Sequence, residues 1–211
     1  MIKKVVKLIL RFFCKSFAIA FSYSSLTKLI SFRVKLYTYW IAKEFKSMGD
    51  LVLIYYPINL VGGKYILLGN RVLIGKNAVL TAWDRYKGDV FIPVITIGND
   101  TSIGEDCHIT AINKITIGKN VLIGKKVTIT DNDHGKTDSK SLTLPPIDRR
   151  LYSKGPVIIE DNVWIGDKAT ILGNVKIGEN AIIGANSLVT KDVPKNCVVG
   201  GVPAKIIKII N

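Results

Sequence analysis

The chain has 211 residues, of which 48% are hydrophobic, and its formal net charge is +14. This length is enough for one domain with a sizeable core plus an appendage, and no apolar run is long enough for a membrane-spanning helix. Three scattered cysteines form neither a disulfide framework nor a cysteine-based metal site. Because no signal-peptide pattern is present either, we expect a cytoplasmic chain with reduced thiols.

Basic residues are concentrated at the start of the chain. Residues 1–50 contain ten Lys and Arg against two acidic residues, a local charge of +8, which usually indicates an anionic partner. Within residues 1–20, cations occupy one helical face and aliphatic and aromatic residues the other. The cations of this face are Lys4, Lys7, Arg11 and Lys15. We therefore predict a basic amphipathic helical segment over residues 1–50.

Two roles remain open for this segment. A basic amphipathic helix with aromatics is typical of a peripheral contact with an anionic membrane, here the inner face of the cytoplasmic membrane. The same apolar face could instead pack on the end of the following domain as a cap. We expect no nucleic-acid partner, because the chain has no recognition motif and the helix is too apolar on one side.

A six-residue repeat runs through the rest of the chain. Its first position is aliphatic, its second is often Gly, its fourth is Asn or Asp, and its fifth is small or β-branched. The aliphatic positions are Leu68, Ile74, Leu80, Ile97, Ile103, Ile109, Ile117, Ile123, Ile129, Ile159, Ile165, Ile171, Ile177, Ile183 and Val189. The Asn and Asp positions are Asn77, Asp100, Asp106, Asn120, Asn162, Asn174, Asn180 and Asn186.

These residue types predict short strands joined by tight corners. Gly and Asn tolerate the left-handed backbone of a corner, and the aliphatic residue stacks on its counterpart in the next coil. No single unit can bury its own apolar face, so the repeat indicates a parallel β-solenoid. A β-sandwich is excluded, because sandwich strands do not recur at exact multiples of six.

The rhythm is interrupted in three places, at residues 81–96, around Asn113, and over 131–156. The last insertion returns to the repeat in phase, so we predict an inserted loop on a rigid scaffold, where functional sites are usually built. His134 lies where this loop leaves the solenoid. A histidine is the usual general base, although a loop histidine is more often simply solvated. His108 precedes an inward aliphatic residue and should point outward, whereas Cys107 occupies a small inward position and should serve packing.

The repeat resembles that of the hexapeptide-repeat acyltransferases. The resemblance covers about residues 66–211 and is strongest to the maltose, galactoside and capsule-type O-acetyltransferases, including those that modify O-antigen and colanic acid polysaccharides. It implies a left-handed parallel β-helix over residues 51–203, against the usual right-handed crossover rule. We expect the helical segment 1–50 before it and a short C-terminal helix over 204–211 after it.

The resemblance also implies the catalytic base. In this family the catalytic histidine lies at the base of such a loop, within a D-H-x-H-G-like motif, and this chain has Asp131-Asn132-Asp133-His134-Gly135. Asn132 replaces the first histidine of the motif, so His134 is the expected base. Asp131 and Asp133 are both candidates to orient it, as is a backbone carbonyl.

The family binds acetyl-CoA in a groove between neighbouring solenoids of a homotrimer. The segment 155–208 resembles the part that forms this groove. Carried over by position, the cofactor-binding residues are Trp164, Gly166, Asp167, Ala185, Thr190, Lys191, Lys205 and Lys208. The lysines would contact the phosphates as point charges.

The expected activity is acetyl-CoA-dependent O-acetylation of a sugar hydroxyl in lipopolysaccharide, capsule or exopolysaccharide synthesis. The acceptor is left open between a lipid-linked and a soluble saccharide. Candidate acceptor-binding residues are Trp83, Asp84, Arg85, His108, Asn113, Asn132 and Asp133, although Trp83 could equally be loop packing. The alternatives are an N-acetyltransferase for a nucleotide-linked amino sugar or small amine, and an inactive scaffold. A zinc carbonic anhydrase would need three histidine ligands, and the chain has two, so we expect no metal site.

Overall fold

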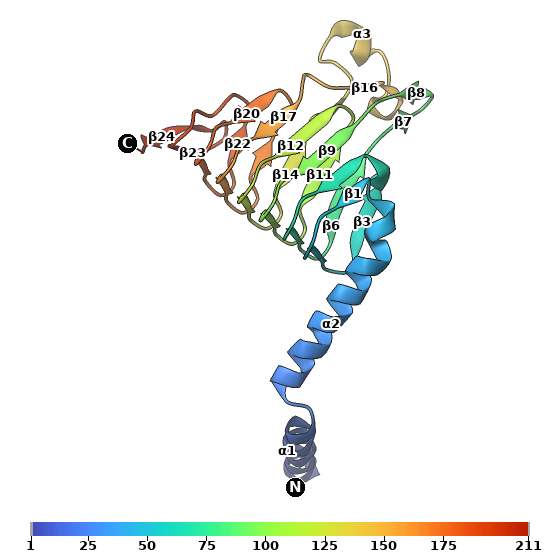
Figure 1. Cartoon of the computed structure of the whole chain (residues 1–211), viewed down its shortest axis with the longest axis vertical. Coiled ribbons are helices and arrows are strands. Elements are labelled where there is room, and N and C mark those ends of the chain that lie inside the picture. Colours follow the sequence, from blue (N-terminus) through green and yellow to red (C-terminus); the bar gives the residue numbers. More distant parts are fainter. Residues whose placement is uncertain (1, 211) are drawn as a thin grey trace.

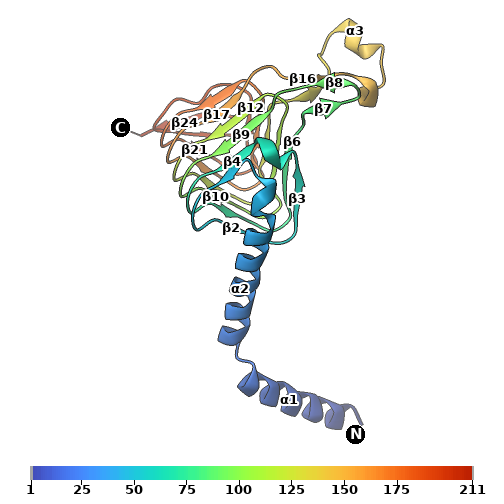
Figure 2. The same ribbon diagram turned by 45° about the vertical axis from the view of Figure 1, so that its right-hand side comes forward.

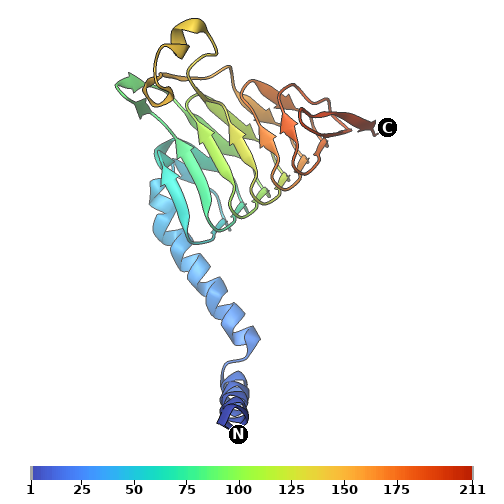
Figure 3. The ribbon, with the colours of Figure 1, turned by 180° about the vertical axis from the view of Figure 1, so that it is seen from behind.

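Residues 47–209 form a stack of coils, each with three faces. The structure is a computed structural model that describes residues 2–210. Successive strands of a coil belong to three different sheets, with six, eight and six strands, and neighbouring strands in these sheets are parallel except for the last pair of the eight-stranded sheet. Figures 1 and 3 show the coils following one another from the end beside helix α2 to the C-terminus. The predicted parallel solenoid is confirmed, and its first strand begins at Ser47, before the expected residue 51.

The strands group by sheet. The first sheet contains β1 (Ser47–Met48), β4 (Ile66–Leu68), β9 (Val94–Ile97), β12 (Lys114–Ile117), β17 (Val157–Ile159) and β20 (Val175–Ile177). The second contains β2 (Leu53–Ile54), β5 (Leu73–Ile74), β10 (Ser102–Ile103), β13 (Leu122–Ile123), β18 (Trp164–Ile165), β21 (Ile182–Ile183), β23 (Cys197–Gly200) and β24 (Lys205–Ile209). The third contains β3 (Ile58–Val61), β6 (Ala78–Ala82), β11 (His108–Ala111), β14 (Thr128–Thr130), β19 (Thr170–Ile171) and β22 (Leu188–Val189).

The repeat aliphatics stack in columns inside the coils. In the second sheet Ile74 pairs with Ile103, which pairs with Ile123, and each is at most 1% exposed. All the predicted aliphatic positions are buried in the same way. The small inward residues share this interior, as Cys107 illustrates with no exposed surface. The core is therefore one narrow, continuous apolar column that holds each coil in register with the next.

The corners of the coils have the left-handed backbone that the repeat predicts. All eight Asn and Asp positions of the repeat have positive φ, between 55° for Asn120 and 63° for Asn174. Among side-chain-bearing residues, Asn and Asp adopt this conformation most readily. Glycines precede many of these corners because the next coil lies too close for a side chain. A Cβ on Gly98, for example, would lie 2.5 Å from backbone atoms of Gly118.

Two helices precede the solenoid, and they differ in what they contact. Helix α1 (Ile2–Ala20) leads into α2 (Tyr23–Ile41), which the 3₁₀ turn η1 (Ala42–Glu44) joins to the first coil. Figure 2 shows the bend between the helices and α1 directed away from the coils. The C-terminal half of α2 buries Val34, Thr38 and Ile41 against the first coil. The Thr38 hydroxyl accepts the Ile54 N–H (2.9 Å) and donates to the Val34 carbonyl (2.8 Å).

Helix α2 therefore provides the cap, whereas α1 keeps large apolar side chains in solvent, including Phe12, Phe13 and Phe17. Of the helices within residues 2–210, none combines the length with the apolar character that crossing a bilayer requires. Met1 and Asn211, the outermost residues of the two predicted terminal segments, lie outside the described residues.

The prediction of a C-terminal helix is wrong, because Lys205–Ile209 forms strand β24. This strand turns back and pairs antiparallel with β23, the last parallel strand of the second sheet. The segment is rich in isoleucine, whose branched Cβ disfavours a helix and suits a strand. The free edge of β23 also supplies backbone partners that an isolated helical turn would lack.

Both long insertions leave the solenoid at the corner between the third and first sheets. The first contains the hairpin β7 (Arg85–Tyr86) and β8 (Asp89–Val90). The second, within residues 131–156, contains β15 (Asp133–His134), α3 (Ser139–Leu142), the 3₁₀ turn η3 (Pro146–Asp148) and β16 (Leu151–Tyr152). A further 3₁₀ turn, η2 (Gly63–Tyr65), precedes β4.

Candidate functional site

The two insertions pack against each other beside the solenoid, as all three ribbon views show (Figures 1 to 3). The Tyr86 hydroxyl donates to the Ile147 carbonyl (3.0 Å), and Lys87 forms an ion pair with Asp148. A second ion pair joins Arg150 to Asp89 at 3.2 Å. These contacts give the long 131–156 loop a fixed partner, although it lies outside the apolar column.

His134 is held in a two-stranded ribbon at the base of this loop. Strand β15 pairs antiparallel with β16, which sets His134 opposite Leu151 and Asp133 opposite Tyr152. The imidazole packs edge to face against the Tyr86 ring, with centroids 5.8 Å apart and planes at 68°. The ribbon therefore carries His134 away from the solenoid wall while its ring stays packed.

Both histidines line one cavity of about 450 Å³, which we call the histidine cavity. It lies over the outer face of the third sheet and is closed on one side by the hairpin and the ribbon. Its lining residues are Asn59, Val61, Val79, Thr81, Trp83, Tyr86, His108, Thr110, Thr128, Thr130, Asn132, His134 and Leu151.

The lining offers hydroxyls, amides and aromatic rings rather than fixed charges. The Thr81 residue is 4% exposed, and its buried hydroxyl has no hydrogen-bond partner among the described residues. A buried unpaired hydroxyl is costly, so a ligand hydroxyl that met it would be favoured. Trp83 is 36% exposed and presents part of its ring to the same space. Desolvation lowers the pKa of His108, which favours the neutral imidazole.

The predicted acceptor-binding residues separate into two groups. Trp83, His108 and Asn132 line the histidine cavity with His134, and so does Tyr86, which was not predicted from the sequence. Tyr86 directly follows the Trp83-Asp84-Arg85 stretch, so its place in that insertion was the available signal.

The remaining predicted residues do not line this cavity. The Asp84 carboxylate forms an ion pair with Lys64 and accepts a hydrogen bond from the Tyr65 hydroxyl, each at 3.0 Å. These contacts lower the pKa of Asp84. Arg85 is exposed on the hairpin, and Asn113 lines a neighbouring cavity under the loop. Asp133 lines a further cavity, of about 590 Å³, which His134 also borders. His134 therefore lies in the wall between two openings.

The carboxylates beside His134 have other partners. Asp131 is 1% exposed and accepts the backbone N–H groups of Ile112 and Asn113, both at 2.9 Å. Burial raises its pKa despite these hydrogen bonds. Asp133 forms an ion pair with Lys154 at 3.6 Å. Asp131 thus fixes the corner around Asn113, where the repeat is interrupted.

Cys107 packs inside the solenoid, where burial raises the pKa of its thiol to about 11. A thiol in this state is a poor nucleophile at neutral pH, which agrees with the packing role predicted for it. Among residues 2–210, no three His, Cys, Asp or Glu side chains are grouped in a way that could hold a metal ion.

The predicted cofactor residues are spread over one side of the C-terminal coils. Trp164 is 50% exposed on the outer face of the second sheet, and Gly166 and Asp167 form the corner after it. The coils are tightly spaced here, because a Cβ on Gly166 would lie 2.6 Å from the Ala185 nitrogen. One Asp167 oxygen accepts the Lys125 N–H at 2.8 Å. Within a single chain Trp164 and Asp167 lie at the surface of the coils.

The other predicted cofactor residues lie at two different places. Thr190 and Lys191 follow β22, at the corner where the long insertions leave earlier coils. Lys205 pairs with Gly200 and Lys208 pairs with Val198, and a register shift between these pairs accommodates one extra residue in β24. Paired residues of a ladder point to the same face, and residues two apart on a strand do so too. The two lysines therefore share one face of the terminal ribbon.

A family model and several known proteins match the chain. Residues 156–191 match the family described as bacterial transferase hexapeptide (six repeats). The chain is 40% identical over 121 residues to WbbJ of Escherichia coli K12, a protein assigned to O-acetyl transfer in lipopolysaccharide biosynthesis. This match covers 56% of the chain and 62% of WbbJ, so the chain spans less than two thirds of this relative.

Two solved structures resemble most of the chain. The hexapeptide-repeat acetyltransferase VCA0836 of Vibrio cholerae, complexed with acetyl-CoA, is 25% identical with a TM-score of 0.60, covering 90% of this chain and 91% of VCA0836. A point mutant of AntD, an N-acyltransferase of Bacillus cereus, in complex with dTDP and coenzyme A, is 25% identical with a TM-score of 0.63. That match covers 79% of this chain and 85% of AntD. The predicted family resemblance is thus confirmed: the chain carries the hexapeptide repeat of bacterial transferases on a left-handed parallel β-helix, and it is similar to hexapeptide-repeat acetyltransferases.

Proposed function

We propose that the chain is an acetyl-CoA-dependent O-acetyltransferase that modifies a sugar hydroxyl in surface polysaccharide synthesis. The observation that carries this proposal is the histidine cavity. It combines His134 with hydroxyl, amide and aromatic groups suited to a sugar. A sugar ring offers apolar faces for Trp83 and hydroxyls for the threonines and Asn132. Similarity to WbbJ supports the same class of acceptor.

His134 is the proposed general base. Its imidazole removes the proton of the acceptor hydroxyl as the hydroxyl oxygen attacks the thioester carbonyl of acetyl-CoA. The tetrahedral intermediate then collapses, its C–S bond breaks, and the imidazolium returns the proton to the departing thiolate. The sugar ester and free CoA are the products, and no covalent enzyme intermediate is needed. A backbone N–H near a coil corner would stabilise the oxyanion.

We further propose that acetyl-CoA binds between neighbouring solenoids of a homotrimer. Trp164, Gly166, Asp167 and Ala185 would line the pantetheine arm, and Thr190 and Lys191 would contact it from the other corner. Their spread over the surface of one chain supports a groove that a second chain completes. Lys205 and Lys208 would then contact the phosphates. CoA bound to VCA0836 and AntD supports the choice of cofactor.

Helix α1 is the proposed contact with an anionic membrane. It contains four lysines and one arginine and no acidic residue, and its apolar side chains are exposed rather than packed on the solenoid. The enzyme would then be peripheral on the inner face of the cytoplasmic membrane.

N-acylation is the second candidate, because AntD is an N-acyltransferase. The two functions are separated by incubating the chain with acetyl-CoA and a panel of sugars and amino sugars, with mass spectrometry as the readout. Oxygen esters should disappear on mild base or hydroxylamine treatment, whereas amides should persist. Base-stable product alone would replace the O-acetyltransferase proposal with the N-acyltransferase one. No product with any acceptor would contradict both.

A further inference from the structure

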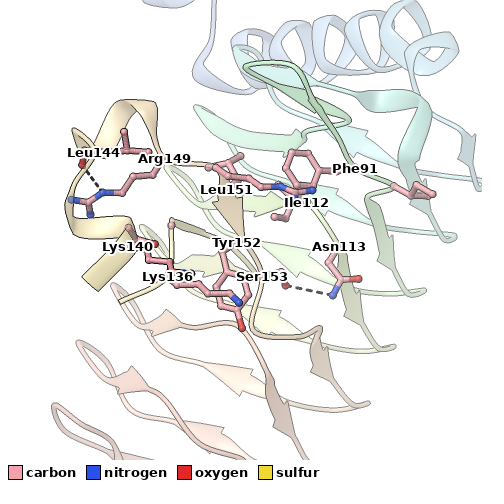
Figure 4. Close-up of a pocket in the computed structure, with 14 residues that line it drawn as sticks. Phe91, Ile112, Asn113, Lys136, Lys140, Leu144, Arg149, Leu151, Tyr152 and Ser153 are labelled. Carbon is pink, nitrogen blue, oxygen red and sulfur yellow. Dashed lines mark hydrogen bonds between the residues drawn. The ribbon is translucent and has the colours of Figure 1, made fainter. Parts of the chain in front are cut away.

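A cavity under the 131–156 loop is lined by positively charged and no negatively charged residues. This basic cavity has a volume of about 730 Å³ and is drawn in Figure 4. Its lining residues are Phe91, Ile92, Ile112, Asn113, Gly135, Lys136, Lys140, Ser141, Leu144, Arg149, Arg150, Leu151, Tyr152 and Ser153. Four of them are cationic and none is acidic, although the loop itself contains acidic residues.

The acidic residues of the loop all have hydrogen-bond or ion-pair partners. Asp131 accepts backbone N–H groups inside the corner, and Asp133 pairs with Lys154. Asp138 accepts the Ser141 N–H at 2.8 Å, and Asp148 pairs with Lys87 on the hairpin. None of these four carboxylates lines the basic cavity.

One of the four cations is also neutralised. Arg150 pairs with Asp89 at 3.2 Å and lies over the Phe91 ring. For Lys136, Lys140 and Arg149, no carboxylate of residues 2–210 lies within the 4.0 Å of an ion pair. Three cations therefore line one cavity without forming an ion pair, although Lys136 and Arg149 also border the neighbouring cavity that Asp133 and Asp138 line.

The internal contacts of these side chains leave charged N–H donors available. Figure 4 shows Lys136 lying across Tyr152, with its ammonium 4.9 Å from the ring centroid, and Arg149 bent toward Leu144. Arg149 donates through Nε to the Leu144 carbonyl (2.9 Å), so its two terminal nitrogens remain for a ligand. Like charges gathered without counter-charges repel one another, and an anion in the cavity would relieve that repulsion.

The basic cavity adjoins His134. Gly135, which follows His134, lines it, and so does Leu151, which pairs with His134 across the ribbon. Leu151 also lines the histidine cavity, so the ribbon separates the two spaces by the width of one strand pair. A molecule that reached His134 with one end could extend a neighbouring group into the basic cavity.

We propose that the basic cavity binds the phosphate groups of a diphosphate-linked sugar acceptor. This inference rests on the O-acetyltransferase function proposed above and narrows its acceptor. Three cations suit a diphosphate better than a single carboxylate, and Arg149 can offer N–H donors from both terminal nitrogens to a phosphate. The attached sugar would lie in the histidine cavity, on the other side of the ribbon. The diphosphate could join the sugar either to a nucleoside or to a lipid carrier.

The test compares three acceptors that present the same sugar: free, linked to a nucleoside diphosphate, and linked to a short prenyl diphosphate. The variant is Lys136→Gln with Lys140→Gln, because both side chains are free of ion pairs within residues 2–210. The matched control is Lys46→Gln with Lys119→Gln, which removes the same charge from exposed lysines outside the cavity. The cavity variant should raise the KM of the diphosphate-linked acceptor at least about tenfold, since a charge-assisted contact typically contributes that much. Its kcat, its KM for acetyl-CoA and its use of the free sugar should remain those of the control.

The two linked acceptors identify the source of the diphosphate, and preference for either supports the proposal. An equal effect on free and linked sugars would overturn it, and so would a raised KM for acetyl-CoA alone, which would assign the cavity to the cofactor. Calorimetry with inorganic pyrophosphate gives a readout independent of turnover. Pyrophosphate binding that the cavity variant loses would support the cavity even if no acceptor were acetylated, in which case only the proposed function fails. Absence of pyrophosphate binding to the unmodified chain would contradict the cavity proposal whatever the activity.

Discussion

Tyr86 and His134 meet edge to face with ring centroids 5.8 Å apart, although they belong to two separate insertions. Tyr86 is itself anchored through its hydroxyl to the Ile147 carbonyl of the loop that carries His134. One side chain therefore contacts both the proposed base and the far side of the loop. The β7–β8 hairpin is therefore part of the candidate site.

Replacement of the proposed base is the most direct prediction. His134→Ala should lower acetyl transfer by at least about 10²-fold, because general-base catalysis typically contributes that much. Affinity for acetyl-CoA, measured by calorimetry, should be nearly unchanged, since the imidazole is not a proposed cofactor contact. Turnover by this variant at the rate of the unmodified chain would remove His134 as the base.

The corner held by Asp131 should control stability. Asp131→Ala leaves the buried N–H groups of Ile112 and Asn113 without their acceptor, and each loss costs about 1–3 kcal/mol. Asp131→Asn keeps one acceptor oxygen, so its stability should lie between that of the unmodified chain and that of Asp131→Ala. Thermal and denaturant unfolding measure the order of the three proteins, and equal stability of all three would contradict the role assigned to this carboxylate.

The pKa of Asp131 gives this series a pH dependence. Burial raises the pKa, so the folded chain holds the proton up to a higher pH than the unfolded chain does. The stability that this group contributes is therefore complete below its unfolded-state pKa and falls as the pH rises through its folded-state pKa. The Asp131→Asn variant should lack this decrease, which unfolding measured across the acidic range would detect.

The terminal lysines should affect the binding of acetyl-CoA more than the rate of the chemical step. Lys205→Ala with Lys208→Ala should raise the KM for acetyl-CoA more than it lowers kcat, because phosphate contacts are remote from the reacting carbonyl. The two lysines share a face through the register of β24 with β23. Lys205→Arg with Lys208→Arg, which keeps both charges, should preserve the KM. An unchanged KM in the alanine variant would mean that the lysines face only solvent.

The chain should be a homotrimer in solution, because the proposed cofactor groove needs two neighbouring solenoids. Light scattering coupled to size exclusion should give three times the mass of one 23.3 kDa chain. A stable monomer that retains full activity would contradict both the trimer and the shared groove.

Removal of residues 1–20 should separate membrane binding from catalysis. Four cations on one face of α1 contribute roughly 1 kcal/mol each near an anionic surface, and exposed Phe12, Phe13 and Phe17 add apolar burial. The full chain should sediment with anionic liposomes and be released by salt, whereas the truncated chain should remain in solution and still acetylate a free sugar. Since α2 provides the cap, the truncated solenoid should remain folded. Indifference of the full chain to anionic liposomes would refute the membrane proposal.

The solenoid was predictable because its residues obey a strict period. Each aliphatic residue of the repeat is buried, and each Asn or Asp of the repeat adopts the left-handed corner. Equivalent positions of the repeat, such as Ile103 and its counterparts in the neighbouring coils, have the same surroundings. The environment of each can therefore be inferred from the repeat alone. The in-phase return at Ile159 likewise located the loop.

The candidate site was only partly predictable, because the residues that face outward follow no period. Tyr86 reaches the histidine cavity because the hairpin and the loop pack against each other there, and no spacing encodes that contact. The C-terminal strand was missed for a related reason. Its conformation depends on the free edge of β23, which the segment 204–211 does not reveal by itself.

The way in which the two ends of the solenoid are covered limits how far the stack of coils can extend. A parallel coil offers the same row of backbone donors and acceptors to whatever follows it, so nothing in the repeat itself limits the number of coils. Here Thr38 occupies the Ile54 donor at one end, and the returning strand β24 occupies the edge of β23 at the other. One end is thus covered by a hydroxyl on a helix and the other by an antiparallel strand. Because both edges are occupied, the end of one molecule cannot pair with the opposite end of another. A chain stripped of both would carry two matching faces, and molecules could then add head to tail into filaments. The limited length of the solenoid therefore depends on helix α2 and strand β24, which lie outside the hexapeptide pattern.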